Sequence, residues 1–254
     1  MAYFKFENKN IFYEITGEGE PLLLFHGNSV SSRMFHPLLK FYAENYNVLL
    51  FDFPGHGKSS RLEKFETDFW YYSSKVANAL LEELNLKNVN VIGTSGGALV
   101  GINLALEHPD KVKFLVADSF EGEAPLGTYV KTIREDRERD KQMEEAQEFW
   151  KNMHGDDWEK VVDLDTDVNV EFAKTGNSFF HKSISELNVP TLLTGSLEDE
   201  YCNHLDKIFA GLKDKNPALK IHLFEKGNHP AMFSNQEEFL KIVNEFIAAK
   251  KSYG

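Results

Sequence analysis

The sequence has little of what marks a secreted, membrane-spanning or nucleic-acid-binding protein. Cys202 is its one cysteine, so an internal disulfide is impossible and a reducing compartment such as the cytoplasm is expected. The chain has no apolar run near the ~18 residues that cross a bilayer, and its start has no signal-peptide pattern. Basic residues are few as well. The 28 Lys and Arg stand against 40 Asp and Glu, and the net charge of −12 disfavours nucleic acid and membrane surfaces as partners.

What is present is enough apolar material for a sizeable core. With 254 residues, 42% of them hydrophobic, the chain can form one large α/β domain. Short, continuously apolar runs predict strands that are buried on both faces. These runs cover residues 22–25, 48–51, 89–92, 114–117, 191–193 and 221–224.

Helical stretches separate these runs along most of the chain. Residues 68–84 carry an apolar stripe at helical spacing, and Ser234 with Glu237 forms a capping-box pattern that predicts the start of the last helix. Strands that alternate with helices predict a doubly wound, mostly parallel sheet. Residues 3–6 and 11–16 are joined by polar residues instead, which predicts an antiparallel hairpin at the sheet edge.

The alternation breaks between residues 119 and 186, which are helix-like and contain no clear strand. We interpret this segment as a small helical cap, or lid, inserted between two sheet strands and packed over the strand ends. The core would then comprise residues 1–118 and 187–254. Residues 134–142 are almost wholly polar, which predicts a solvated helix face.

The most informative segment is Gly93-Thr-Ser95-Gly-Gly97, at the junction of a predicted strand and a predicted helix. Two small residues allow a tight turn that lifts the hydroxyl of Ser95 clear of the backbone. The first N–H groups of the following helix then point at whatever Ser95 attacks. The pattern predicts that Ser95 is a nucleophile.

A serine nucleophile needs a base, and the base needs a carboxylate that fixes its tautomer. His229 follows the run 221–224, at the same predicted edge of the sheet as Ser95. Asp199 follows the run 191–193 in the same way and is our preferred acid. Glu198, one residue earlier, and Asp118, at the end of the run 114–117, are alternatives.

The oxyanion that forms on an attacked carbonyl is normally bound by two backbone N–H groups. Gly96 directly follows the nucleophile and supplies one of them. Asn28, in the turn after the run 22–25, is expected to supply the other, whereas His26 in the same turn is assigned a structural role. Residues 52–59, rich in turn-forming types, are interpreted as a structural turn that frames the site.

Taken in order, these segments resemble the α/β-hydrolase fold superfamily. The resemblance rests on His26-Gly-Asn28, residues 52–59, Gly93-Thr-Ser-Gly-Gly97, Gly195-Ser-Leu-Glu-Asp199 and Gly227-Asn-His229. It implies an eight-stranded sheet, a triad of Ser95, His229 and Asp199, an oxyanion hole from Asn28 and Gly96, and neither a cofactor nor a metal. The family's usual spacing from glycine to acid would select Glu198, so Asp199 departs from it by one residue.

Family membership alone does not decide the substrate, which we expect to be a small molecule. Hydrolysis of small or medium carboxylic esters through an acyl-enzyme is the default prediction. An aminopeptidase similar to proline iminopeptidases is the alternative, with Glu121 and Glu123 as candidates for binding an amine. Lactone or carbon–carbon bond hydrolysis, and a receptor of low activity, are further alternatives. Aromatic and methionine side chains in the cap are candidates for lining the site: Phe120, Phe149, Trp150, Met153, Trp158, Phe172, Phe179 and Phe180.

Overall fold

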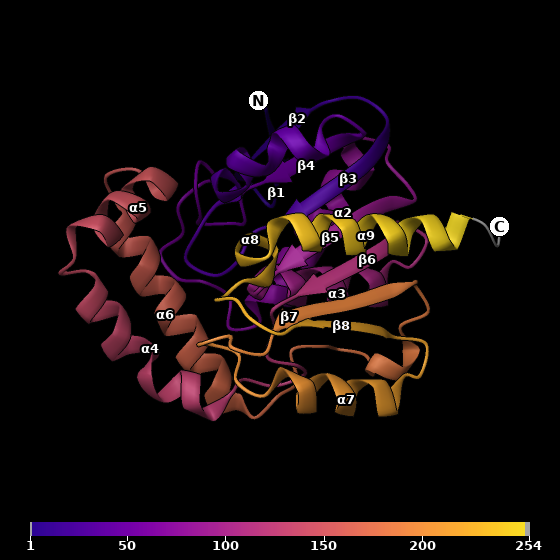
Figure 1. Ribbon diagram of the computed structural model, residues 1–254. Coiled ribbons are helices and arrows are strands. Elements are labelled where there is room, and N and C mark those ends of the chain that lie inside the picture. The colour runs from indigo at the N-terminus through magenta and orange to yellow at the C-terminus, as the bar shows by residue number, and fades with distance from the viewer. Residues whose placement is uncertain (1, 252–254) are drawn as a thin grey trace.

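One sheet of eight strands runs through the middle of the molecule, with helices on both of its faces (Figure 1). The computed structural model describes residues 2–251, the side chains of 249–251 excepted. The strand order is β1-β2-β4-β3-β5-β6-β7-β8. Their bounds are β1 (Ala2–Phe6), β2 (Lys9–Thr16), β3 (Glu20–Phe25), β4 (Tyr46–Phe51), β5 (Val89–Thr94), β6 (Val112–Asp118), β7 (Thr191–Ser196) and β8 (Lys220–Phe224).

The strands confirm the pattern expected from the sequence. Each of the apolar runs falls inside one of the strands from β3 to β8, and these strands pair in parallel. The hairpin β1–β2 is antiparallel and pairs with β4 at one edge. Alternate side chains of β3 enter opposite layers, because successive residues of a strand point to opposite faces: Leu23 and Phe25 enter one core cluster, and Leu22 and Leu24 enter the other.

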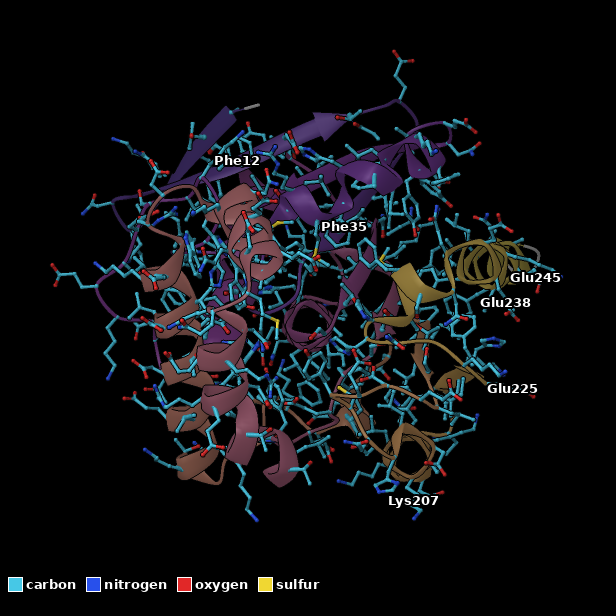
Figure 2. All side chains as sticks on the ribbon, turned by 60° about the vertical axis from the view of Figure 1, so that its left-hand side comes forward. Phe12, Phe35, Lys207, Glu225, Glu238 and Glu245 are labelled. Atoms are coloured by element: carbon cyan, nitrogen blue, oxygen red, sulfur yellow. The ribbon has the colours of Figure 1, made fainter. Side chains whose placement is uncertain are left out.

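Helices cover both faces of this sheet. The face that carries Leu23 packs against α2 (Phe69–Glu83), α3 (Gly96–Glu107) and α7 (Leu205–Lys215). The opposite face packs against α1 (Leu39–Tyr42), α8 (Ala231–Ser234) and α9 (Gln236–Lys251), together with the 3-10 turn at Ser32–Leu38. Figure 2 shows the charged side chains Lys207, Glu225, Glu238 and Glu245 extending outward at the periphery.

Three further helices lie between β6 and β7, and we refer to them as the cap helices: α4 (Gly127–Asp140), α5 (Glu144–His154) and α6 (Trp158–Thr175). They lie side by side at one end of the sheet (Figure 1). In the described part of the chain this segment contains no strand, as expected. The exact division between core and cap at residues 118 and 187 stays a prediction. Within residues 2–251, none of the helices combines the length and apolarity needed to cross a bilayer.

Two local expectations were wrong. Ser234 does not begin the last helix: it ends α8, its hydroxyl donates to the carbonyl of Asn228, and α9 begins at Gln236 after a break. The polar segment 134–142 is not a uniformly solvated face, because Arg137 is buried where α4 packs on α6. In both cases the packing of helices against their neighbours, rather than the local sequence pattern, determines the structure.

Candidate active site

Ser95 occupies a strained turn between β5 and α3. Its backbone has φ 56° and ψ −128°, a region that residues with a side chain rarely adopt. The helix can start this close to the sheet because Gly97 has no side chain: a Cβ there would lie 2.2 Å from the carbonyl oxygen of Phe25. The hydroxyl of Ser95 is consequently presented at the carboxyl end of β5, at a cavity wall.

His229 and Asp199 form a hydrogen-bonded pair beside this cavity. Nδ1 of His229 lies 2.8 Å from Oδ2 of Asp199, and the aspartate side chain is fully buried. The other oxygen of Asp199 accepts the backbone N–H groups of Tyr201 at 2.9 Å and Cys202 at 2.7 Å. One oxygen of the carboxylate is therefore held by two backbone N–H groups, and the other bonds to His229.

The pair perturbs both pKa values in the sense that favours an imidazolium beside a carboxylate. Burial acts to raise the pKa of Asp199, but the hydrogen bond and charge of His229, together with the N–H groups of Cys202 and Tyr201, hold the pKa below its usual range. Burial likewise acts to lower the pKa of His229, but its bond to Asp199 and the surrounding negative charges together raise it above the ordinary value. His229 is thereby suited to accept a proton in the course of a reaction.

The alternative acids occupy different positions. Glu198 is exposed to solvent. Asp118 is fully buried, but its oxygens accept hydrogen bonds from the hydroxyls of Thr94 and Thr194 and from the N–H of Met232. Burial raises the pKa of Asp118 to about 6 in spite of these bonds. Of the three candidates, Asp199 is the one that bonds to His229.

Asn28 and Gly96 line the same cavity as Ser95. The turn that holds Asn28 approaches Ser95 closely, since a Cβ on Gly27 would lie 3.2 Å from the Cβ of Ser95. His26 stabilises this turn through two hydrogen bonds. Its Nδ1 donates to the carbonyl of Gly27 at 2.8 Å, and its Nε2 accepts the N–H of Phe53 at 3.0 Å. These bonds agree with the structural role expected for His26.

The residues 52–59 likewise form a structural turn. The carboxylate of Asp52 accepts the backbone N–H and the hydroxyl of Ser32 at 2.9 and 2.6 Å and the N–H of Lys58 at 2.7 Å. His56 is fully buried and lies 3.5 Å from a carboxylate oxygen of Asp165 in α6. Neither Asp52 nor His56 lines the cavity.

The cavity has a volume of about 460 Å³ and runs between the ends of the strands and the cap helices. Of the aromatic side chains considered from the sequence, Phe120, Phe149 and Trp150 line it. The others pack elsewhere: Phe172 and Phe179, for example, stack on each other and contact Trp70. On the cap side, apolar side chains such as Ile133, Phe149 and Trp150 alternate with charged ones: Asp136, Arg137, Asp140 and Glu145. Ser95 and His229 lie on the sheet side.

Several lining residues of α4 are absent from the sequence-based prediction. Tyr129, Ile133 and Arg137 all line the cavity. They are four residues apart, so they share one helix face, and this spacing could have identified them. Arg137 donates to Asp165 at 2.6 Å and to Thr166 at 2.9 Å. Burial acts to raise the pKa of Asp165, but Arg137 and His56 together lower it to about 2.

Glu121, which the sequence suggested as a possible amine ligand, does line the cavity. Burial raises its pKa to about 7. Glu123, the second candidate, forms an ion pair with Lys215 and does not line the cavity. The two acids therefore have different environments.

Among the described residues, one group has donor atoms close enough to hold a metal: Asp199, Cys202 and His229, within 4.8 Å of one another. Two of them already bond to each other, and the thiol of Cys202 donates to the carbonyl of Ser119 at 3.6 Å. Burial raises the pKa of this thiol well above its ordinary value, which disfavours the thiolate form that metals bind. The donor set is therefore better suited to proton transfer than to holding an ion.

Comparison with known proteins gives a family match and several relatives. The model of a family described as "alpha/beta hydrolase fold" matches residues 20–146, 127 of the 254 residues. A (E)-2-((N-methylformamido)methylene)succinate hydrolase of Acinetobacter baylyi is 33% identical over 108 residues, which cover 42% of this chain and 40% of that protein. A pimeloyl-[acyl-carrier protein] methyl ester esterase of Legionella pneumophila is 23% identical, covering 94% of this chain and 99% of that protein.

Solved structures have the same fold. The esterase EaEST of Exiguobacterium antarcticum superposes with a TM-score of 0.78 at 17% sequence identity, over 97% of this chain and 99% of that one. At this identity the likeness concerns the fold alone. The first relative is matched over only about 40% of its length, so the similarity to it is confined to part of that protein.

Proposed function

The chain belongs to the alpha/beta hydrolase fold family, and from this premise we propose that it is a serine hydrolase of small or medium carboxylic esters. The observation that carries the proposal is the 2.8 Å hydrogen bond between His229 and Asp199 beside the cavity that Ser95 lines. An inert serine in a glycine-rich turn would need no oriented imidazole near it. The names of the relatives, which are hydrolases and include an esterase, agree with this choice.

The proposed reaction has two halves. Nε2 of His229 takes the proton of Ser95 as the serine oxygen attacks the ester carbonyl carbon, and the N–H groups of Asn28 and Gly96 bind the oxyanion. The carbon–oxygen bond to the alcohol then breaks, and the alcohol leaves with the proton held by His229. Water then attacks the acyl-enzyme: it gives a proton to Nε2 of His229 as its oxygen adds to the carbonyl carbon. The bond from that carbon to the oxygen of Ser95 breaks, His229 returns the proton to Ser95, and the carboxylic acid leaves.

The lining of the cavity supports an acyl group that is largely apolar. Leu99, Phe120, Ile133, Phe149 and Trp150 supply apolar surface around the space next to Ser95. A volume of about 460 Å³ accommodates a substrate of small or medium size. Transferring each buried methylene from water contributes about 0.8 kcal/mol, so affinity should rise with chain length until the cavity is filled.

A direct test labels the serine and then varies the acyl chain. A fluorophosphonate is expected to modify Ser95 of the native protein, located by peptide mass spectrometry, and Ser95→Ala should remove both labelling and turnover. A series of p-nitrophenyl esters should show kcat/KM rising and then falling as the chain lengthens. Absence of labelling, or esterase activity that survives Ser95→Ala, would reject the proposal.

An aminopeptidase is the second candidate, because carboxyl groups line the cavity and Glu121, on the sheet side, is one of them. Glu121 lines it and lies near enough to His229 for that imidazole to lower the carboxyl's pKa, although burial raises the pKa overall to about 7. A substrate ammonium group would be attracted to the ionised form. Aminoacyl anilides, assayed beside the esters with the native protein and Glu121→Gln, distinguish the candidates: an aminopeptidase prefers the anilides and loses that preference in the variant.

A further inference from the structure

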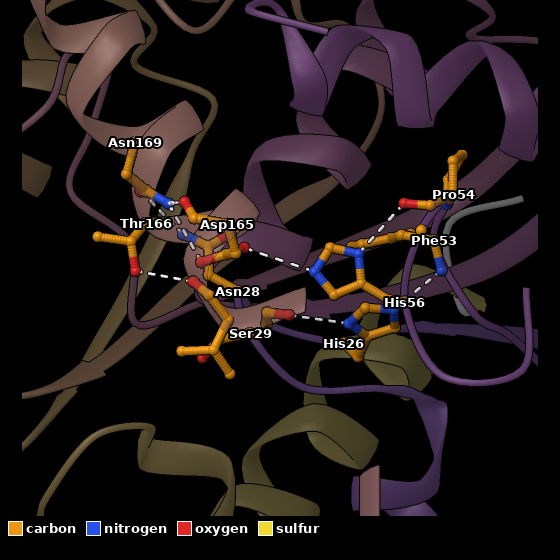
Figure 3. A network of polar contacts seen from close by, with 12 residues as sticks. His26, Asn28, Ser29, Phe53, Pro54, His56, Asp165, Thr166 and Asn169 are labelled. Carbon is orange, nitrogen blue, oxygen red and sulfur yellow. Dashed lines mark hydrogen bonds and ion pairs between the residues drawn. The ribbon is translucent and has the colours of Figure 1, made fainter. Parts of the chain in front are cut away.

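The turn that carries Asn28 is held from two sides. On the core side, the indole Nε1 of Trp70 in α2 donates to Oδ1 of Asn28 at 3.1 Å. On the cap side, Nδ2 of Asn28 donates to Oδ1 of Asn169 in α6 at 3.2 Å. Asn28 and Asn169 are 141 positions apart in the chain, so the contact joins two distant segments. Figure 3 shows Asn28 beside Asp165 and Asn169, with His56 and His26 on the other side.

The hydrogen bonds form a series from Trp70 through Asn28 and Asn169 to Asp165. The groups at the two ends of this series determine which atom donates in each bond. An indole N–H can only donate, so it selects the oxygen of the Asn28 amide and turns its NH₂ toward Asn169. Asn169 must therefore offer its oxygen, and its own NH₂ donates to the carbonyl of Asp165 at 2.7 Å and to Oδ2 at 3.3 Å. Because both amides are oriented from both ends, the reversed orientation of either would place two donors or two acceptors together.

Asp165 can hold this position because its charge is compensated. Its side chain is fully buried, and Arg137 donates to the same oxygen, Oδ2, at 2.6 Å. Asn169 is also buried, 3% exposed. Asn169 is thus a buried amide between a carboxylate and a second amide, and its amide group bonds to protein groups at both ends.

The amide of Asn28 lies directly against the other residue of the proposed oxyanion hole. A Cβ placed on Gly96 would be 2.0 Å from Oδ1 of Asn28 and 3.0 Å from Nε1 of Trp70. The orientation of the Asn28 side chain therefore sets how closely its turn approaches the backbone of Gly96. The two proposed main-chain donors belong to these two residues, so this contact bears on their separation.

A second contact from the cap holds the next residue of the turn. Nε2 of His154, at the end of α5, lies 3.0 Å from the carbonyl oxygen of Ser29, and its Nδ1 accepts the N–H of Gly57 at 3.0 Å. Since Nδ1 accepts, the proton is on Nε2, which donates to Ser29. Burial, and after it the electrostatic effect of His56, lowers the pKa of His154 to about 3. His154 therefore stays neutral near pH 7, and the directions of its two hydrogen bonds are maintained.

We propose that Asn169 is a positioning residue for catalysis: through its bond to Asn28, oriented by Asp165, it sets the geometry of the two oxyanion donors. The cap thereby contributes to transition-state stabilisation as well as to the wall of the cavity. This inference rests on the proposed serine hydrolase and adds to it a residue that touches no substrate. Misplacing a catalytic group by about 1 Å costs up to ~10²-fold in rate, which bounds the expected effect.

The test compares Asn169→Ala with Asn103→Ala. Asn103 in α3 is an equally buried amide, and it donates to the carbonyls of Leu99 and Phe179 rather than to the turn. Once native turnover and its loss in Ser95→Ala are established, Asn169→Ala should lower kcat about 10- to 100-fold with little change in KM. Asn103→Ala should lower the thermal unfolding temperature similarly without that loss of kcat.

Two further readouts separate positioning from a merely structural role. A trifluoromethyl ketone, which forms an oxyanion on Ser95, should bind Asn169→Ala more weakly by the same factor as kcat/KM falls. A dialkyl ether of similar shape, which has no carbonyl, should keep its affinity. The double variant Asn28→Ala/Asn169→Ala should be no slower than Asn28→Ala alone, since residues that act through one contact are not additive.

An assay independent of turnover follows from the indole. The chain has three tryptophans, so few indole N–H signals are expected in its NMR spectrum. The Nε1–H resonance of Trp70 should shift in Asn169→Ala, because its acceptor, the side-chain oxygen of Asn28, is reoriented. If the native protein did not hydrolyse esters, the proposed function would be rejected. The Trp70 resonance would in that case still report the contact between Asn169 and Asn28. Unchanged kcat in Asn169→Ala, equal loss in Asn103→Ala, or additive effects in the double variant would overturn the positioning role.

Discussion

Replacing Asp199 by asparagine tests the triad through a change of tautomer. One oxygen of Asp199 accepts the N–H groups of Tyr201 and Cys202, at 2.9 and 2.7 Å. These are donors, so the introduced amide must keep its oxygen on them and turn its NH₂ toward Nδ1 of His229. Nδ1 then has to accept, and the imidazole proton moves to Nε2, the atom that should accept the proton of Ser95.

The expected loss is large because the base has its proton on the wrong nitrogen while the geometry is intact. A substitution of this kind typically lowers kcat about 10⁴-fold, which corresponds to about 5 kcal/mol at ~1.4 kcal/mol for each factor of ten. The measurement is kcat for a p-nitrophenyl ester at several pH values, with circular dichroism to check that the variant is folded.

Two matched controls determine which acid is used. Glu198→Gln removes the exposed neighbouring carboxylate and should leave kcat unchanged. Asp118→Asn removes a buried carboxylate that bonds to Thr94, Thr194 and Met232 rather than to His229, and it should act mainly on stability. If Asp199→Asn retained native turnover, or if Glu198→Gln lost as much as Asp199→Asn, the assignment of the acid would be refuted.

Three further expectations follow from the same site. His229 must be neutral to act as a base, and its pKa is raised. We therefore expect kcat/KM to fall as the pH is lowered, with a midpoint above pH 6.5. A midpoint below that pH would contradict the pairing with Asp199. Ser95→Ala should lower kcat about 10⁶-fold, whereas Asn28→Ala should retain measurable turnover, because the proposed donor at Asn28 is its backbone N–H group. Equal losses of kcat in the two variants would contradict this expectation. Arg137→Met removes the guanidinium that pairs with the buried carboxylate of Asp165, at a cost of about 3–5 kcal/mol in urea unfolding at neutral pH. Arg137 and His56 together lower the pKa of Asp165 to about 2, so this stabilisation is fully present above the unfolded pKa near 3.8 and is lost as the pH falls toward 2. The deficit of the variant should narrow in acid, and a constant deficit would contradict the role of the pair.

Much of the site could be predicted because its signals are local. Glycines that permit a strained turn adjoin Ser95, and apolar runs end a few residues before Asn28, Asp199 and His229. In a parallel sheet the carboxyl ends of the strands meet at one edge, so strand assignment alone predicts which loops are neighbours. The cavity lined by Ser95, Asn28, Gly96 and His229 lies at that edge.

The contribution of the cap could not be derived in this way, because it depends on the rotation and packing of three helices. Arg134, Arg137 and Arg139 look alike in the sequence, yet only Arg137 among them is buried in the described structure, on the face of α4 that α6 covers. The partners of Asn169 are likewise determined by tertiary packing: nothing near it in the sequence points to a residue 141 positions away. Periodicity identifies an apolar stripe, but a buried polar side chain adds no signal of its own to that stripe.

Side-chain length also favours Asp199 over Glu198 as the partner of His229. Aspartate readily accepts N–H groups two and three residues further on, which closes a turn of its own backbone with one oxygen. Asp199 does this with Tyr201 and Cys202, and its second oxygen is left facing His229. A glutamate has one more methylene and closes such turns poorly, so it would hold its carboxylate less rigidly at the same place. The spacing from Gly195 is therefore a weaker guide to the acid than the turn that the acid itself stabilises, and an Asp199→Glu variant should keep the charge yet lose much of kcat.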